Sequence, residues 1–173
     1  MEKECVEYFN LIDKGMIEIE YPYISKQFYY EASVTSRLIA NRERISILNT
    51  LAQKYDVKFY TDCKKTEELD SKVKIMPPVN YDDISRIYSN SKININITLH
   101  CIETGIPERV FDVMAAGGFM LSNYQEELEE LFVPGEDIVL YHNLEELEEK
   151  VEYYLTHEEE RKRIAKNGQR KVI

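Results

Sequence analysis

The sequence lacks any long apolar stretch. No run within its 173 residues approaches the roughly 20 apolar residues that a membrane-spanning helix needs. Its first residues, MEKECVEYFNLIDKG, are charged and amphipathic, without the apolar centre of a signal peptide. Because both features are missing, we expect a soluble protein of the cytoplasm with no membrane span.

Cysteine is scarce, and one common cofactor motif is missing. Cys5, Cys63 and Cys101 are odd in number, widely spaced and in no Cys-x-x-Cys pattern, which fits a reducing compartment and gives no metal-site spacing. No Gly-x-Gly-x-x-Gly follows an expected strand, which argues against a dinucleotide-dependent oxidoreductase. The sequence therefore gives no direct sign of a bound cofactor.

Acidic residues outnumber basic residues, so the net charge is −10 and the isoelectric point is about 4.9. Between Glu126 and Glu160, acidic residues are frequent and Lys150 is the only base. Such a surface repels phosphodiester backbones, so nucleic acid is a poor candidate partner. The proportions of hydrophobic residues (43%) and charged residues (31%) are those of a folded globular protein.

Short apolar segments alternate with helical segments along most of the chain. The expected strands are DVKFYT, KVKIM, KININIT, GFMLS and DIVLY, and segments of helical periodicity follow most of them. This alternation is typical of βαβ units with right-handed crossovers. It predicts the α/β class, with an open, mostly parallel, Rossmann-like sheet of about five strands and helices on both faces.

The length favours one main domain. A long helix is expected to begin close to Ser36, so we predict a helical, tyrosine-rich lead-in over residues 1–35 and the Rossmann-like domain over residues 36–173. Later helix starts carry capping signals. These signals are Asn80, Ser122 with Gln125, Asn143 with Glu146, and Thr156 with Glu159.

The segment HCIETGIPERVFDVMAAGG, which follows the KININIT strand, is the candidate site. Gly105 allows a sharp bend, and Pro107 suits the first position of a helix. Free N–H groups at that helix start, together with Arg109, would form an anion site suited to phosphate. Asp112 lies one turn further on the same flank, where its carboxylate could accept both hydroxyls of a ribose.

Several of these polar residues have a plainer explanation. Glu108, Arg109 and Asp112 could simply form a solvated helix face. The asparagines that alternate with isoleucine in KININIT indicate either a thinly covered sheet face or hydrogen bonds to the loops of a site. His100 and Cys101 form a pair that can suggest nucleophilic or metal chemistry, but no partner of fitting spacing accompanies them.

The chain resembles a known family from residue 91 onward, and more weakly from about residue 36. The segments SKININIT, GIPERVFDVMAAGGFMLSN and PGEDIVLY resemble the C-terminal, donor-binding half of GT-B glycosyltransferases, particularly the bacterial group related to spore-maturation glycosyltransferases. The resemblance implies an enzyme domain that holds a nucleotide-diphosphate sugar without a metal or other cofactor. The absence of an Asp-x-Asp motif agrees with this.

The resemblance also assigns donor-binding residues but no catalytic residue. The wider family carries two acidic residues separated by seven others; Asp112 matches the second, which binds the donor ribose, and the first falls on Thr104, beside Glu103. Arg109 matches an arginine that we assign to the pyrophosphate. Arg42 and Arg44 match basic residues near the domain start, or are ordinary helix-surface charges. The implied set is His100, Glu103, Thr104, Gly105, Ile106, Arg109, Asp112, Arg42 and Arg44.

A complete GT-B enzyme has a second Rossmann-like domain that faces the first across a cleft. The resemblance therefore implies that this chain is a fragment that lacks the N-terminal domain, with an unknown acceptor. Such a fragment would bind nucleotide weakly and transfer nothing. The alternative is a non-catalytic nucleotide-binding or spore-associated structural module of the same fold.

Overall fold

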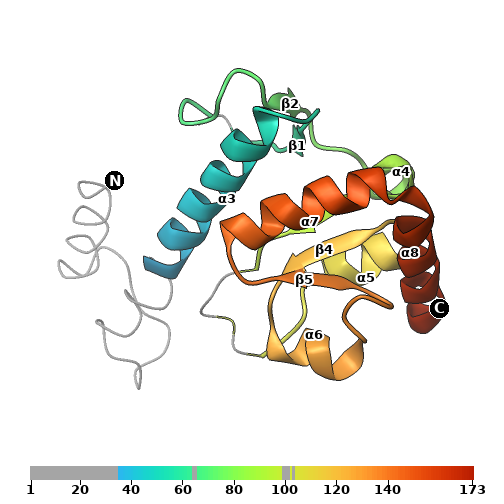
Figure 1. Cartoon of the computed structure of the whole chain (residues 1–173). Coiled ribbons are helices and arrows are strands. Elements are labelled where there is room, and N and C mark those ends of the chain that lie inside the picture. The colour runs from blue at the N-terminus through green and yellow to red at the C-terminus, as the bar shows by residue number, and fades with distance from the viewer. Residues whose placement is uncertain (1–34, 64–65, 99–101, 103) are drawn as a thin grey trace. The chain divides into compact units, whose positions relative to one another are not determined.

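The computed structural model describes residues 35–63, 66–98, 102 and 104–173 (Figure 1). Residues 44–98 and 102–173 belong to one compact unit, which contains all five strands of the described part. The predicted lead-in of residues 1–35 lies, except for Thr35, outside the described residues. The described elements are α3 (Ser36–Ala52), β1 (Lys58–Tyr60), β2 (Lys74–Met76), α4 (Tyr81–Asn90), β3 (Asn94–Asn96), α5 (Glu108–Ala115), β4 (Met120–Asn123), α6 (Glu126–Leu131), β5 (Val139–Tyr141), α7 (Leu144–Thr156) and α8 (Glu158–Val172).

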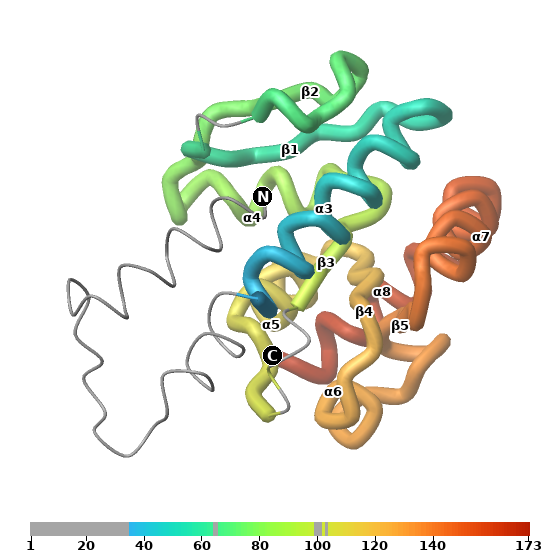
Figure 2. Tube along the Cα trace, turned by 90° about the vertical axis from the view of Figure 1, so that its left-hand side faces the viewer, coloured from blue at the N-terminus to red at the C-terminus, as the bar shows by residue number. Residues whose placement is uncertain are grey.

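The five strands pair in parallel, which confirms the predicted α/β class. Within the described residues they form two sheets rather than one, β1–β2 and β3–β4–β5 (Figure 2). Between the unpaired edges of β1 and β3 lies a cavity of about 1050 Å³, lined on one side by Phe59 and on the other by Asn94 and Ile95. Strand segments were therefore predictable, but not their division between sheets.

Helices cover both faces of the three-stranded sheet, as the sequence predicts. Leu121, Val139 and Tyr141 belong to a core with residues of α3, α7 and α8, whereas Met120 and Leu140 belong to a core with residues of α5 and α6. Figure 1 shows α7 on one side of β4 and β5, and α6 on the other. Because successive strand residues point to opposite faces, β4 and β5 are buried on both sides.

The asparagines of β3 hydrogen-bond within the fold. The Asn94 side chain donates to the carbonyl of Tyr88 at 3.0 Å. The Asn96 side chain, which is fully buried, donates to the hydroxyls of Thr98 and Ser122, each at 2.9 Å. The sequence left open hydrogen bonds to the loops of a site, and this holds for Asn96 through Thr98, whereas Asn94 bonds the end of α4 instead. These bonds replace those that water would make to the amide nitrogen of Asn96, whereas its Oδ1 atom is buried without a hydrogen-bond partner among the described residues.

The glycines after α5 allow a close approach between elements. Gly117 has φ of +75°, a conformation that other residues rarely adopt. A Cβ atom on Gly118 would lie 2.8 Å from both the Asn94 side-chain nitrogen and the Tyr88 carbonyl oxygen. A side chain at this position would therefore push β4 away from the end of α4.

Capping predictions were right at some helix starts and wrong at others. Asn80 and Asn143 occupy the N-cap positions of α4 and α7. The Asn143 side chain accepts a hydrogen bond from the Glu146 N–H at 2.9 Å, whereas the Asn80 side chain makes no capping hydrogen bond. Ser122, in contrast, is a buried residue of β4, because α6 begins only at Glu126. Thr156 is the last residue of α7 rather than the cap of α8.

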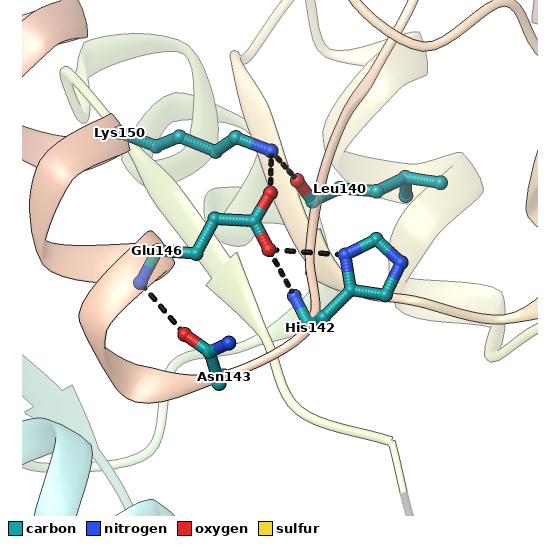
Figure 3. A network of polar contacts seen from close by, with 5 residues as sticks. All are labelled: Leu140, His142, Asn143, Glu146 and Lys150. Carbon is teal, nitrogen blue, oxygen red and sulfur yellow. Dashed lines mark hydrogen bonds and ion pairs between the residues drawn. The ribbon is translucent and has the colours of Figure 1, made fainter.

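The side chain of Glu146 ties the start of α7 to the end of β5 (Figure 3). One carboxylate oxygen accepts from the backbone N–H of His142 at 2.8 Å and lies 3.0 Å from Nδ1 of that residue. The other oxygen lies 2.5 Å from Nζ of Lys150, which also donates to the carbonyl of Leu140. The Lys150 hydrogen bond is the main reason that the pKa of Glu146 falls from 4.5 to about 2.

We expect Glu146→Gln to lower the free energy of unfolding at pH 7 by about 1–2 kcal/mol, since the group is partly exposed and solvent screens its charge. A carboxylate whose pKa is lowered by folding stabilises the protein above its unfolded pKa, and this contribution is lost as pH falls through the folded value. The difference from wild type should therefore shrink between pH 4.5 and pH 2.

Urea denaturation from pH 7 downward measures this difference. Glu145→Gln is the matched control, because Glu145 is an exposed neighbour in the same helical turn. A destabilisation by Glu146→Gln that does not change with pH, or one that Glu145→Gln reproduces, contradicts the assignment.

Candidate functional site

The candidate site begins where the chain enters α5. Gly105 is exposed and has φ of +99°, which confirms the sharp bend that the sequence predicts there. Pro107, which was predicted to be the first helical residue, is instead the N-cap residue, because α5 begins at Glu108. Thr104 is exposed, and Ile106 packs against the core beneath α5. His100 and Glu103, also predicted site residues, lie outside the described residues.

The buried and exposed sides of helix α5 are those that the helical period predicts, with one exception. Val110, Val113 and Met114 are buried, Arg109 is exposed, and Asp112 is half-buried. Phe111, which the spacing would bury, is 37% exposed; its ring centroid lies 6.2 Å from that of Phe132. Arg109 and Asp112 therefore lie on the outer side of α5, on successive turns.

Asp112 faces helix α4. The hydroxyl of Tyr81, the first residue of α4, lies 3.5 Å from Oδ1 of Asp112. The Asp112 charge is the main reason that the pKa of Tyr81 is raised. Both residues line a hollow of about 360 Å³ between α4 and α5, together with Tyr88 and Ala115. The phenol thus stays protonated at neutral pH and can donate to the carboxylate.

The larger cavity has two predicted arginines in its lining. Arg109 of α5 and Arg44 of α3 both line the cavity of about 1050 Å³, although they are 65 positions apart in the sequence. Arg109 has no hydrogen bond or ion pair with another residue of the described part, so its guanidinium is available for an anion. Arg42 lies outside the compact unit of residues 44–98 and 102–173, and its role stays a prediction.

Glu127 is a site residue that the sequence did not indicate. Its Oε2 atom accepts a hydrogen bond from the Gly105 N–H at 2.6 Å. The two residues are 22 positions apart, and only the parallel pairing of β3 with β4 brings α6 to the start of α5. A carboxylate from the chain itself therefore occupies the N–H group of Gly105, a residue that was predicted to bind the donor.

The polar end of β3 is fixed by a side-chain amide. Asn123 accepts from the Thr98 N–H at 2.8 Å and donates to the Thr98 carbonyl at 3.1 Å. These two bonds hold Thr98, two residues beyond the last paired residue of β3, against Asn123 at the end of β4.

No three residues among His, Cys, Asp and Glu come close enough to hold a metal ion within the described ranges. The predicted absence of a metal stays a prediction. A search of the described helices also found none that is long and apolar enough to cross a membrane.

Comparison with known proteins identifies a family and a similar solved structure. Residues 42–173 match the model of a family described as glycosyl transferase-like. The fold is similar to that of sucrose-phosphate synthase from Thermosynechococcus elongatus, with a TM-score of 0.62 and 14% identity over 76% of this chain. The chain spans 38% of that protein's length. No curated protein matches. Together, the two matches confirm the predicted GT-B type of fold.

We expect Glu127→Gln to bind inorganic pyrophosphate more tightly than wild type, by roughly two- to fivefold at low salt, since exposed charge interactions are worth only about 0.2–1 kcal/mol. The variant keeps an acceptor for the Gly105 N–H but removes a negative charge from the candidate anion site. Calorimetric titration with pyrophosphate measures the change.

Glu130→Gln is the control, because Glu130 is an exposed residue of the same helix without a hydrogen bond to another described residue. Unchanged or weaker pyrophosphate binding by Glu127→Gln contradicts an anion site at Gly105. An equal gain in both variants would mean that only net charge matters.

Proposed function

Because the chain belongs to the glycosyl transferase-like family, whose model its residues 42–173 match, we propose that it binds the donor of a glycosyltransferase. The donor is a nucleotide-diphosphate sugar, and it binds at α5 without a metal ion. Within the family, we assign the chain to the group related to bacterial spore-maturation glycosyltransferases. The reaction takes place in the cytoplasm.

One observation carries this proposal. The half-buried carboxylate of Asp112 lies one helical turn beyond the exposed guanidinium of Arg109 on the same helix. A rise of 1.5 Å per residue separates these positions by about 5 Å along the helix axis, which is about the length of a pyrophosphate-to-ribose step. Arg109 then binds the pyrophosphate, and Asp112 accepts the ribose hydroxyls.

Arg44 is proposed as a second cation that binds the pyrophosphate. It lines the same cavity as Arg109, so two cations from different helices can meet one phosphate chain. Two guanidinium groups supply the charge that a divalent cation supplies in other sites, which is the reason for proposing a metal-independent donor site. Thr104, Gly105 and Ile106 contribute backbone groups beside the α5 start.

In the intact enzyme, the bond between the sugar and the pyrophosphate breaks, and a new bond forms between the sugar and an acceptor oxygen. The nucleoside diphosphate leaves with the bonding electrons, and the acceptor proton passes to a base. Arg109 and Arg44 stabilise the charge that develops on the leaving phosphate, while Asp112 holds the ribose in position. The acceptor site and the base come from a second GT-B domain.

Titration with UDP, GDP and their sugars tests the proposal. We expect binding by the wild type and roughly tenfold weaker binding by Asp112→Asn, because a hydrogen bond to a charged group contributes about 1.5–3 kcal/mol. Asp83→Asn, a change of an exposed carboxylate on α4, should bind as the wild type does. No binding by any of these nucleotides would falsify the donor site, as would full binding by Asp112→Asn.

A non-catalytic module of the same fold is the second candidate. Two observations favour it, namely Thr104 at the first acidic position of the family and the Glu127 carboxylate on the Gly105 N–H. A module of this kind would bind the nucleotide sugar without consuming it even when joined to its second domain. Release of free nucleotide by the longer protein in the presence of acceptor would contradict this alternative.

A further inference from the structure

Tyr124 and His142 form an exposed pair of stacked rings outside the candidate site. Their ring centroids lie 4.8 Å apart, at an interplanar angle of 20°. They follow directly after Asn123 and Tyr141, the last paired residues of β4 and β5. Tyr124 is 39% exposed, and the side chain of His142 is 59% exposed. The pair therefore lies at the carboxyl edge of the sheet, where ligands of open α/β sheets bind.

Carboxylates hold both rings in place. The hydroxyl of Tyr124 donates to Oε2 of Glu129 at 3.0 Å, and this hydrogen bond raises the pKa of Tyr124, so the phenol stays protonated. Nδ1 of His142 lies 3.0 Å from Oε2 of Glu146, which as a carboxylate can only accept. The proton of the neutral imidazole is therefore assigned to Nδ1. Rings that are fixed in this way lose little conformational entropy when a ligand binds.

The exposed parts of the pair have the chemistry that binds a sugar. Nε2 of His142 points away from Glu146 (Figure 3), and in the neutral imidazole it is a hydrogen-bond acceptor for a hydroxyl group. Beside it, the Tyr124 ring offers a flat apolar surface. A pyranose ring has an apolar C–H face bordered by hydroxyl groups, so it can contact both residues at once.

The pair lies away from the proposed phosphate site. Arg44 and Arg109, which we assign to the pyrophosphate, line the cavity between β1 and β3. Tyr124 and His142 follow β4 and β5, which lie on the other side of β3. Because neighbouring strands are about 4.8 Å apart, β5 lies about 10 Å from β3. A donor bound on the β1 side therefore leaves the edge at β4 and β5 to a second substrate.

We propose that Tyr124 and His142 form a subsite for the acceptor, and that the acceptor is a carbohydrate. This proposal rests on the proposed donor-binding function, because it assigns the second substrate of the same reaction. One sugar of the acceptor stacks on the Tyr124 ring, and one of its hydroxyl groups donates to Nε2 of His142. The two residues position the acceptor, while the rest of the acceptor site and the base belong to the second GT-B domain.

A second pair of the same kind provides a matched control. Tyr153 and His157 stack with ring centroids 3.8 Å apart, and Tyr153 is 44% exposed. The Tyr153 hydroxyl donates to Glu160 at 2.8 Å, much as Tyr124 donates to Glu129. Helix α7 begins just after β5, at the carboxyl edge, and Tyr153 lies in its last turn. The control pair is therefore at the far end of α7 from the proposed subsite.

Saturation-transfer NMR tests the subsite in the full chain with UDP or GDP present. The probes are the methyl glycosides of glucose, galactose, mannose and N-acetylglucosamine, and we expect at least one to bind. Tyr124→Ala and His142→Ala should each weaken its binding by about fivefold, as the loss of a ring contact or of one hydrogen bond predicts. Tyr124→Phe keeps the ring and should bind within about twofold of wild type, and so should the control Tyr153→Ala.

The outcomes separate the acceptor subsite from the donor site. Each variant should bind UDP and GDP as the wild type does, which also shows that it folds. The subsite is overturned if no glycoside binds, if neither alanine variant at the pair weakens binding, or if Tyr153→Ala weakens it equally; the proposed function then still stands. Displacement of the glycoside by a UDP-sugar but not by UDP overturns it as well, because the pair would then hold the sugar of the donor. Failure of the wild type to bind any nucleotide overturns the proposed function and the subsite together.

Discussion

The parallel pairing of β4 with β3 on one side and β5 on the other is the constraint on which the described site depends. Parallel neighbours require crossover connections, and here α5 and α6 supply them. Both connections leave strands at the same edge of the sheet, so the loop before α5 and the start of α6 meet there. The hydrogen bond from Gly105 to Glu127 is a direct result of this arrangement.

Local patterns predicted the elements better than the contacts between them. The strand segments, the helix with Arg109 and Asp112 on one side, and the Asn143 cap could be predicted because alternation, helical period and capping depend on residues close in sequence. The same capping rule was wrong at Ser122, because burial of β4 on both faces kept that residue in the strand. The helical spacing of apolar residues in α5 would bury Phe111, yet the ring of Phe111 stays partly exposed beside Phe132.

Contacts between distant residues could not be predicted from one sequence. The division of five parallel strands into two sheets depends on which edges meet, and each strand has only three or four residues to determine its neighbour. Likewise, nothing near Glu127 or Tyr81 in the sequence indicated a partner on α5 or before it. The family resemblance identified Asp112 but not the hydroxyl that lies beside it, since that hydroxyl comes from another helix.

The glycine after α5 determines how far the two helices of the site stand apart. A Cβ atom on Gly118 would lie 2.8 Å from the Tyr88 carbonyl oxygen near the end of α4, so the missing side chain lets the start of β4 lie close to that point. Tyr88 and Tyr81 belong to the same rigid helix, so a shift at one end of α4 moves the other end. The absence of a side chain at Gly118 therefore helps to determine the width of the hollow beside Tyr81, two helical turns away along α4. The dimensions of the hollow are in this sense a property of the sheet rather than of the residues that line it.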